Sequence, residues 1–171
     1  YNPELNAVTY IHRKSDYYTE SPSLPSTAKT GVIVANVSTN WGATWDSTAI
    51  WANATNWGRY PQGGIYNPTG NTSISNAYVI GTGPTVANTT WSGNYYASKK
   101  LNTFDATAST APGAQYFFDL ALASYPAGQF SHGWTRNGFT STLDGKVHAI
   151  GVTETDLQGL STVTGFAVLT G

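Results

Sequence analysis

Residues 38–45 read STNWGATW, and this short stretch lies between two segments that are typical of β-strands. A short polar side chain such as that of Asn40 accepts hydrogen bonds from the backbone amides of its own turn. Gly42 can adopt a positive φ without steric cost, and Trp45 has a large apolar face that can cover the turn. The stretch therefore predicts a tight hairpin in which Asn40 accepts backbone N–H groups.

The rest of the chain has the same β character. Strands are predicted where β-branched and aromatic residues alternate with polar ones, and no segment keeps a helical period over three turns. The chain is therefore predicted to be all-β, with a strand spacing typical of a sandwich, a barrel or a propeller. Long loops are expected at 14–29 and 102–114, and residues 115–122 fit either a strand or a helical turn. The predicted strands cover residues 7–13, 31–37, 47–52, 63–67, 76–82, 95–101, 115–122, 145–152 and 162–170.

The composition narrows the class of protein. Only 10% of the 171 residues are charged and the formal net charge is -1, which argues against nucleic-acid binding because that function needs a basic patch. No apolar run approaches the ~20 residues that span a bilayer. Cys and Met are absent, which excludes disulfides, thiolate metal sites and a cysteine nucleophile. The abundance of Thr, Ser, Asn, Gly and Tyr is typical of extracellular β-proteins. The N-terminus has no signal-peptide pattern, so we expect a mature chain or part of a longer one.

The opening stretch also resembles a known motif. It is similar to the Asp-box, the Ser-x-Asp-x-Gly-x-Thr-Trp hairpin of sialidase-type β-propellers. Asparagine replaces the aspartate here, so the turn keeps an acceptor for backbone amides and loses its charge. In sialidase-type propellers this box is structural and lies away from the catalytic pocket, so the resemblance implies a fold and no reaction. The residues at the motif positions are Ser38, Asn40, Gly42, Thr44 and Trp45.

Residues 58–86, GRYPQGGIYNPTGNTSISNAYVIGTGPTV, resemble a strand-loop-strand unit of large secreted propeller proteins of Bacteroidetes. The likeness covers about residues 5–101. Such proteins typically carry a C-terminal sorting domain for type IX secretion. The resemblance implies an extracellular or cell-surface location, with the type IX secretion machinery as a partner if the parent chain carries that domain. We expect one all-β region over residues 1–171, formed by two to three blades of a partial propeller, with a β-sandwich as the alternative fold.

Catalytic residues are not assigned by the sequence. A sialidase-type site needs three arginines that clamp a carboxylate, a Tyr/Glu nucleophile pair and an acidic acid/base residue. The chain has Arg13, Arg59 and Arg136, a number that is suggestive, but the sequence does not establish an alignment of these three with the family's triad. Arg59 is more simply explained as a structural or loop residue, and Asp16 is an acid/base candidate only because it is close to Arg13. The three histidines lack metal-ligand spacing, so no metal or cofactor is predicted.

Aromatic residues are the other candidate source of function, because their flat faces can stack on sugar rings. Most of them must form the core, and Trp57, Arg59 and Tyr60 remain as candidate ligand-binding residues. We expect a secreted or cell-surface module with a structural, adhesion or interaction role and a glycan or protein partner. Part of a sialidase-type glycoside hydrolase is the alternative. Lys99 and Lys100 are expected to form a solvated pair. The aromatic residues considered are Trp41, Trp51, Trp57, Tyr60, Trp91, Tyr95, Tyr96 and Trp134.

Overall fold

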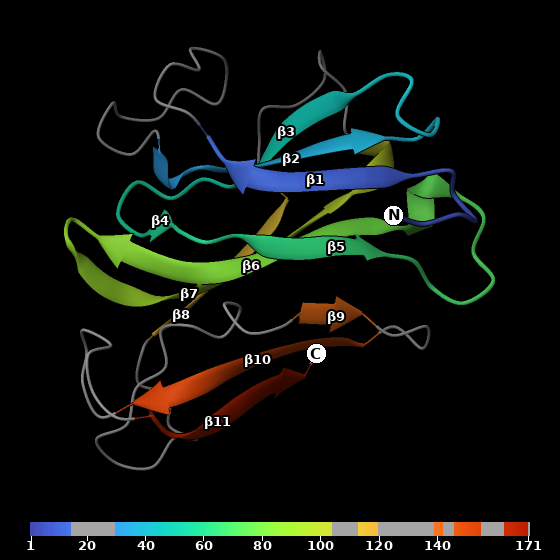
Figure 1. Ribbon diagram of the computed structural model, residues 1–171. Coiled ribbons are helices and arrows are strands. Elements are labelled where there is room, and N and C mark those ends of the chain that lie inside the picture. Colours follow the sequence, from blue (N-terminus) through green and yellow to red (C-terminus); the bar gives the residue numbers. More distant parts are fainter. Residues whose placement is uncertain (15–29, 104–112, 120–138, 142–145, 155–162, 171) are drawn as a thin grey trace.

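Figure 1 shows a computed structural model of the chain. The structure describes residues 1–14, 30–103, 113–119, 139–141, 146–154 and 163–170. Within these ranges the regular elements are strands and short 3-10 turns, and every strand pairing is antiparallel. The prediction of an all-β chain is confirmed. No helix in the described part of the chain is long and apolar enough to cross a membrane.

The first sheet contains the predicted hairpin. Its order is β1-β2-β3, so β2 lies in the middle, and the β-branched run of β2 is buried on both faces apart from Asn36, which is half-buried. The register pairs Tyr10 with Asn36 and Asn36 with Ser47. The end of β1 that holds Arg13 therefore lies at the opposite end of the sheet from the β2–β3 turn. The strands are β1 (Val8–Arg13), β2 (Ile33–Ser38) and β3 (Asp46–Trp51).

The second sheet has an interrupted edge. Its order is β4-β6-β7-β8, and β5 also pairs with β6. Because β7 occupies the other side of β6, β4 and β5 pair with one edge of β6 in succession. The break between them falls at residues 59–61, where Tyr60 has a positive φ of 42°. The elements are β4 (Trp57–Gly58), β5 (Gln62–Tyr66), η2 (Ile74–Asn76), β6 (Tyr78–Ala87), β7 (Thr90–Lys100), η3 (Leu101–Thr103) and β8 (Ala114–Asp119).

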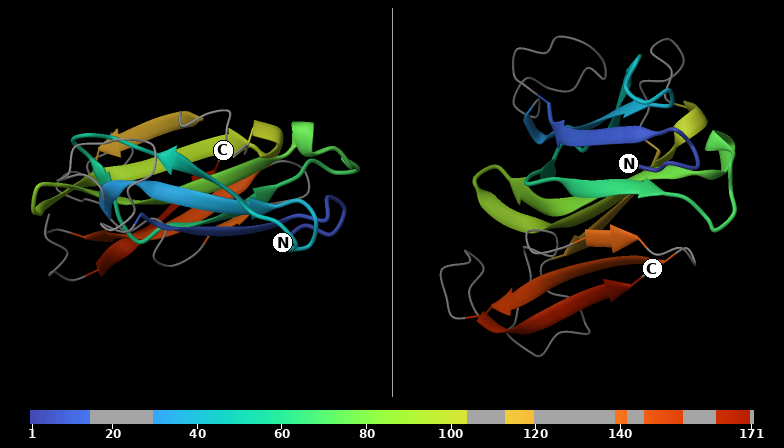
Figure 2. Two further views of the ribbon diagram at one scale, coloured as in Figure 1. Left: turned by 90° about the horizontal axis from the view of Figure 1, so that it is seen from above. Right: turned by 45° about the vertical axis from the view of Figure 1, so that its right-hand side comes forward.

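The third sheet is formed by β9 (Phe139–Ser141), β10 (Val147–Glu154) and β11 (Val163–Thr170), in the order β11-β10-β9. Each of the three sheets is built from strands that follow one another along the chain. Figure 2, in its right-hand view, shows the sheets in the same succession, from blue and teal through green and yellow to orange and red.

The main core lies between the first two sheets. The ring of Trp51 from β3 stacks on that of Tyr95 from β7, with 5.1 Å between ring centroids, and both side chains are fully buried. A Cβ added to Gly81 of β6 would lie 2.5 Å from Cδ1 of Ile50, so the sheets approach closely at this point. The buried residues of this core are Leu5, Ala7, Ile33, Ala35, Val37, Ile50, Trp51, Ala77, Val79, Tyr95, Ala97 and Leu101.

The edge strands β1, β5 and β9 lie one beside another, with β5 in the middle (Figure 1). The arrows of β1 and β5 point in opposite directions, and those of β5 and β9 point in the same direction. The closeness of β1 and β5 agrees with the position of Cδ1 of Ile11, which lies 2.7 Å from a Cβ built on Gly63. The end of β1 and the start of the β4–β5 edge therefore meet at one corner of the molecule.

The predicted strands differ from the observed ones in their bounds, and the short strands β4 and β9 are not among those predicted. Strand β6 extends to Ala87 and strand β7 begins at Thr90, because the connecting residues continue the antiparallel ladder almost to the turn. The ambiguous segment 115–122 forms strand β8 as far as Asp119. The loops expected at 14–29 and 102–114 lie largely outside the described residues.

Candidate binding site at the corner of β1 and β4

The β2–β3 turn has the hydrogen bonds that its sequence indicates. Oδ1 of Asn40 accepts from the backbone N–H of Thr44 at 2.9 Å, and its Nδ2 donates to Oγ1 of Thr44 at 2.8 Å. Oγ of Ser38 accepts from the N–H of Gly42 at 2.7 Å and donates to Oδ1 of Asn40 at 2.9 Å. Gly42 has a φ of 89°. These contacts are internal to the turn, which gives the turn a structural role.

The indole of Trp45 closes the same turn from one side. Its Nε1 donates to the carbonyl of Gly42 at 3.1 Å, while the side chain remains 46% exposed. The turn is therefore only partly covered by Trp45.

The neighbouring Trp41 ties this turn to the segment that precedes β1. Trp41 is held at a positive φ of 59°, and its N–H donates to the carbonyl of Asn6 at 3.0 Å. The turn thus belongs to the end of the first sheet where β1 begins. Arg13 is the last residue of β1, so the turn and the corner described next lie at opposite ends of this strand.

Arg59 is positioned by the break between β4 and β5. Its backbone N–H donates to the carbonyl of Pro84 at 2.9 Å, which keeps the broken edge attached to β6. Nη1 of the guanidinium donates to the carbonyl of Gly58 at 2.9 Å, and the guanidinium carbon lies 5.9 Å from the centroid of the Trp57 ring. This geometry is that of a cation–π contact, so the side chain of Arg59 is held on an aromatic surface.

Tyr60 and Trp91 form the next part of this surface. Their ring centroids are 6.1 Å apart, and Tyr60 is 54% exposed. A positive φ at a bulky residue is unfavourable and occurs in turns and at functional sites. The break in the edge strand therefore presents the ring of Tyr60 outward instead of continuing the sheet.

Arg13 reaches the same corner from the first sheet. Its Nε donates to the carbonyl of Thr30 at 2.9 Å. The next residue, Gly31, lies directly against Trp57, because a Cβ built on Gly31 would overlap Cβ of Trp57. Arg59 thus contacts the ring of Trp57 directly, and Arg13 is bonded to Thr30, the neighbour of the residue that contacts Trp57. We call Arg13, Trp57, Arg59 and Tyr60 the arginine corner.

The two guanidinium groups affect each other. The pKa of Arg59 is lowered from its ordinary value, first by partial burial and then by the positive charge of Arg13. Each guanidinium donates one hydrogen bond to a backbone carbonyl, and a guanidinium has five N–H donors. Within the described ranges neither of them forms an ion pair with a carboxylate. Like charges at close range repel each other, so the corner favours a bound anion.

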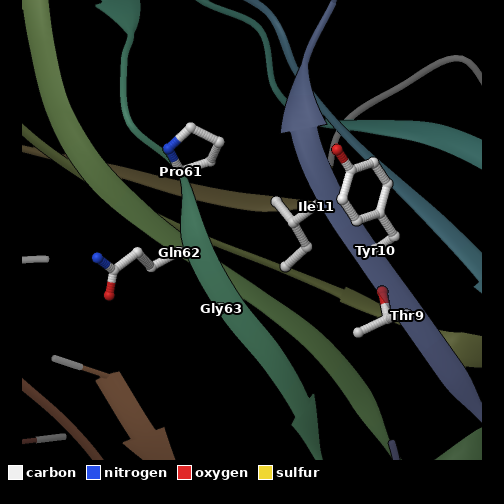
Figure 3. A pocket seen from close by; sticks show the side chains of 6 residues that line it. All are labelled: Thr9, Tyr10, Ile11, Pro61, Gln62 and Gly63. Atoms are coloured by element: carbon white, nitrogen blue, oxygen red, sulfur yellow. The ribbon is translucent and has the colours of Figure 1, made fainter. Parts of the chain in front are cut away.

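An open groove leads away from the arginine corner between β1 and β5 (Figure 3). Its volume is about 380 Å³. Because β1 and β5 run in opposite directions, Arg13 follows one wall and Arg59 precedes the other at the same end of the groove. The residues that line it are Thr9, Tyr10, Ile11, Pro61, Gln62 and Gly63.

The ring of Tyr10 is fixed on the outer face of the first sheet. It stacks on His12 with 5.2 Å between the ring centroids and an interplanar angle of 18°. Nδ1 of His12 lies 2.8 Å from the carbonyl of Arg13, and Nε2 lies 3.2 Å from Nδ2 of Asn36. A ring nitrogen next to a carbonyl donates, and one next to an amide nitrogen accepts, so these contacts fit the neutral imidazole with its proton on Nδ1.

Several residues considered in the sequence have other positions. Trp51 and Tyr95 belong to the core, and the expectation that Lys99 is solvated is wrong. Lys99 is buried, its Nζ donates to Oγ1 of Thr48 at 2.9 Å, and burial lowers its pKa. Strand alternation explains the error, because β7 turns Lys99 toward the first sheet and leaves Lys100 exposed.

The candidates Trp57, Arg59 and Tyr60 lie together, as their adjacency requires. The sequence did not connect Arg13 with them, because the contact depends on the course of β1 relative to β5. Asp16, Trp134 and Arg136 lie outside the described residues. Among the described residues, no group of three or more His, Asp or Glu side chains could hold a metal ion.

Comparison of the chain with protein-family models, with curated proteins and with solved structures gives no match.

Proposed function

We propose that this chain is an interaction module of an extracellular or cell-surface protein, and that it binds an acidic glycan at the arginine corner. The observation that carries the proposal is that Arg59 lies on Trp57 while Arg13, bonded to Thr30 beside the Gly31–Trp57 contact, is close enough for its charge to lower the pKa of Arg59. A carboxylate or sulfate group would accept hydrogen bonds from the remaining guanidinium N–H groups and would relieve the repulsion between the two cations.

The aromatic frame supports a glycan as the ligand. Trp57 supports the guanidinium of Arg59, and the exposed ring of Tyr60 lies next to it in the chain. Sugar rings have flat apolar faces that pack on aromatic rings, and an acidic sugar adds the anion that the arginines require. The corner therefore combines the two kinds of contact that an acidic sugar offers.

Titration with glucuronic acid and glucose, followed by NMR, tests this proposal. We expect glucuronic acid to bind and glucose to bind much more weakly. Arg59→Gln and Arg13→Gln should each weaken the binding of glucuronic acid by about tenfold, because hydrogen bonds to charged groups contribute about 1.5–3 kcal/mol. Lys100→Gln is the matched control, since it removes one positive charge from an exposed residue of β7. Equal affinities of the wild type and Arg59→Gln would show the proposal to be wrong.

The second candidate is part of a sialidase-type glycoside hydrolase. It is favoured by the same pair, Arg13 and Arg59, because such a site clamps a carboxylate between arginines. We propose the binding role first, since the described residues supply two of the three arginines of such a site, and its nucleophile pair and acid/base residue are not assigned. The purified 171-residue chain is expected not to hydrolyse a fluorogenic sialoside. Turnover that is abolished by Arg59→Ala would establish the hydrolase instead.

The finer architecture is also a proposal. Three consecutive antiparallel sheets, with β5 beside both β1 and β9, support the interpretation as two to three blades of a partial sialidase-like propeller. The shared core between the first two sheets and the opposite directions of β1 and β5 support the β-sandwich alternative for residues 1–119. The Asp-box interpretation of residues 38–45 and secretion by a type IX system belong to the propeller proposal.

A further inference from the structure

We infer that the groove between β1 and β5 holds the neutral sugar residue adjoining the acidic one, so that the preferred ligand is an acidic oligosaccharide bound along both sites. This inference rests on the proposed function, because the acidic residue would occupy the arginine corner. Beyond the proposed function, the inference specifies the size of the ligand and the direction in which the ligand extends from the arginine corner.

The course of the strands connects the two sites. Residues 9–11 form one wall of the groove and residues 61–63 form the other. Arg13 lies two positions beyond the first wall, and Arg59 lies two positions before the second. Because β1 and β5 are antiparallel, the two arginines lie at the same end. A ligand whose anion binds the arginines can therefore extend directly into the groove.

The lining of the groove has the chemistry of a sugar site. Tyr10 is 61% exposed, and its ring stacks on that of His12, so the tyrosine offers a sugar an aromatic face that His12 supports. The hydroxyl of Thr9 donates its proton to the carbonyl of Asn36 at 3.0 Å, so it supplies an acceptor for a sugar hydroxyl, and the amide of Gln62 supplies both donors and an acceptor. Figure 3 shows Tyr10 and Thr9 on β1 and Gln62 on β5. The space beside Gly63 is filled by Ile11, since a Cβ built on Gly63 would lie 2.7 Å from Cδ1 of Ile11, so a sugar would lie over these two residues.

The size of the groove favours a short saccharide. Its volume of about 380 Å³ lies near the lower end of the range of about 300–1,000 Å³ that is typical of small-molecule sites. The strands β1 and β5 are also close to each other, with Ile11 against Gly63, so the floor of the groove is closed. An extended peptide cannot be inserted between the two strands as a further strand.

The test compares three kinds of sugar by isothermal titration calorimetry with the full chain. The sugars are glucuronic acid, glucuronyl-glucose disaccharides in two linkage isomers, and the neutral glucose disaccharides of the same linkages. We expect at least one acidic disaccharide to bind about tenfold more tightly than glucuronic acid. Tyr10→Ala should remove that gain and leave the affinity for glucuronic acid unchanged, and Tyr10→Phe should keep the gain. Tyr116→Ala, at an exposed tyrosine of β8, is the matched control.

The outcomes separate this inference from the function on which it rests. If glucuronic acid binds and neither acidic disaccharide binds more tightly, the groove is not a sugar site and the proposed function remains. If the gain is present but survives Tyr10→Ala, the second sugar lies elsewhere and the inference is also wrong. If no acidic sugar binds, the proposed function fails together with the inference.

Discussion

Asn40 shows how much a single side chain contributes to the β2–β3 turn. Its one amide group accepts from the N–H of Thr44 and donates to the hydroxyl of the same residue. These bonds are local, so they could be predicted from the residue types in the stretch 38–45. The exposure of Trp45 could not be predicted in the same way, because it depends on what the rest of the chain places against the indole.

Replacing Asn40 by alanine should lower the free energy of unfolding by about 1 kcal/mol, the usual contribution of one such hydrogen bond. Chemical denaturation measures this change. Asn40→Asp is the control, because the carboxylate still accepts from the N–H of Thr44. We expect this variant to keep most of the stability that Asn40→Ala loses. An alanine variant as stable as the wild type would mean that the turn does not depend on this side chain.

Tyr95 gives a second prediction at the residue scale. Its hydroxyl is buried and has no hydrogen-bond partner among the described residues, and burial raises the pKa of Tyr95 well above its ordinary value of 10.0. Tyr95→Phe should therefore leave stability unchanged or raise it by about 1 kcal/mol, since it removes an unsatisfied polar group. Tyr96→Phe is the control, because the hydroxyl of Tyr96 bonds with Ser98. Marked destabilisation by Tyr95→Phe would show that its hydroxyl has a stabilising partner.

The same residue predicts a dependence on alkaline pH. Below the ordinary tyrosine pKa of 10.0 the hydroxyl is protonated in both the folded and the unfolded chain, so it gives no change with pH. Above that value the unfolded chain loses this proton while the folded chain keeps it, and stability falls as pH rises. In this alkaline range the stability of Tyr95→Phe should therefore fall less steeply with pH than that of the wild type, as denaturation curves measure it. Parallel pH dependences would contradict the raised pKa.

At the scale of elements, the close packing of β6 against the β4–β5 edge holds the arginine corner in place. A Cβ on Gly83 would lie 2.5 Å from the backbone carbonyl oxygen of Arg59 and 2.8 Å from Cε1 of Tyr95. Strands β5 and β6 could be predicted from alternation, but β4 could not, because it has only two residues. The close approach of Gly83 to Arg59 could not be predicted either, since a glycine in a strand does not indicate which backbone lies against it. For the same reason the sequence did not bring Arg13 and Arg59 together.

Gly83→Ala should destabilise the fold by about 1–3 kcal/mol, the usual cost of overpacking, and should weaken the binding of glucuronic acid because it displaces Arg59. Gly70→Ala is a suitable comparison. Gly70 has a positive φ of 76° and no atom within 4 Å of an added Cβ, so its substitution adds backbone strain of about 1–2 kcal/mol without a clash. Thermal unfolding and NMR titration measure the two effects. If Gly83→Ala folds and binds glucuronic acid as tightly as the wild type does, the arginine corner does not depend on the packing of β6.

At the scale of the whole molecule, the sequence predicts the fold class and leaves the arrangement of the sheets open. Alternation along a strand indicates which of its faces is buried. It does not indicate whether successive sheets turn about a common axis or pack as two layers, because both arrangements bury the same alternating residues. The stack of Trp51 on Tyr95 illustrates this point: it joins the first two sheets and is compatible with either arrangement.

The last strand provides a prediction for the whole molecule. Among the described residues β11 pairs only with β10, and its eight residues, VTGFAVLT, carry no charge and no proline. An edge of this kind offers unpaired backbone groups to another chain, since natural edges are usually protected by charges, prolines or covering segments. We therefore expect the 171-residue chain to self-associate as its concentration rises.

Analytical ultracentrifugation of the wild type and of Ala167→Lys and Val168→Lys tests this expectation. Adjacent strand residues point to opposite faces, so the two substitutions place a charge on each face of the edge in turn. We expect at least one of them to reduce self-association while the circular dichroism spectrum stays that of the wild type. Lys100→Gln, which changes charge on β7 and leaves β11 intact, should associate like the wild type. A wild-type chain that stays monomeric at high concentration would show that the edge of β11 is already protected.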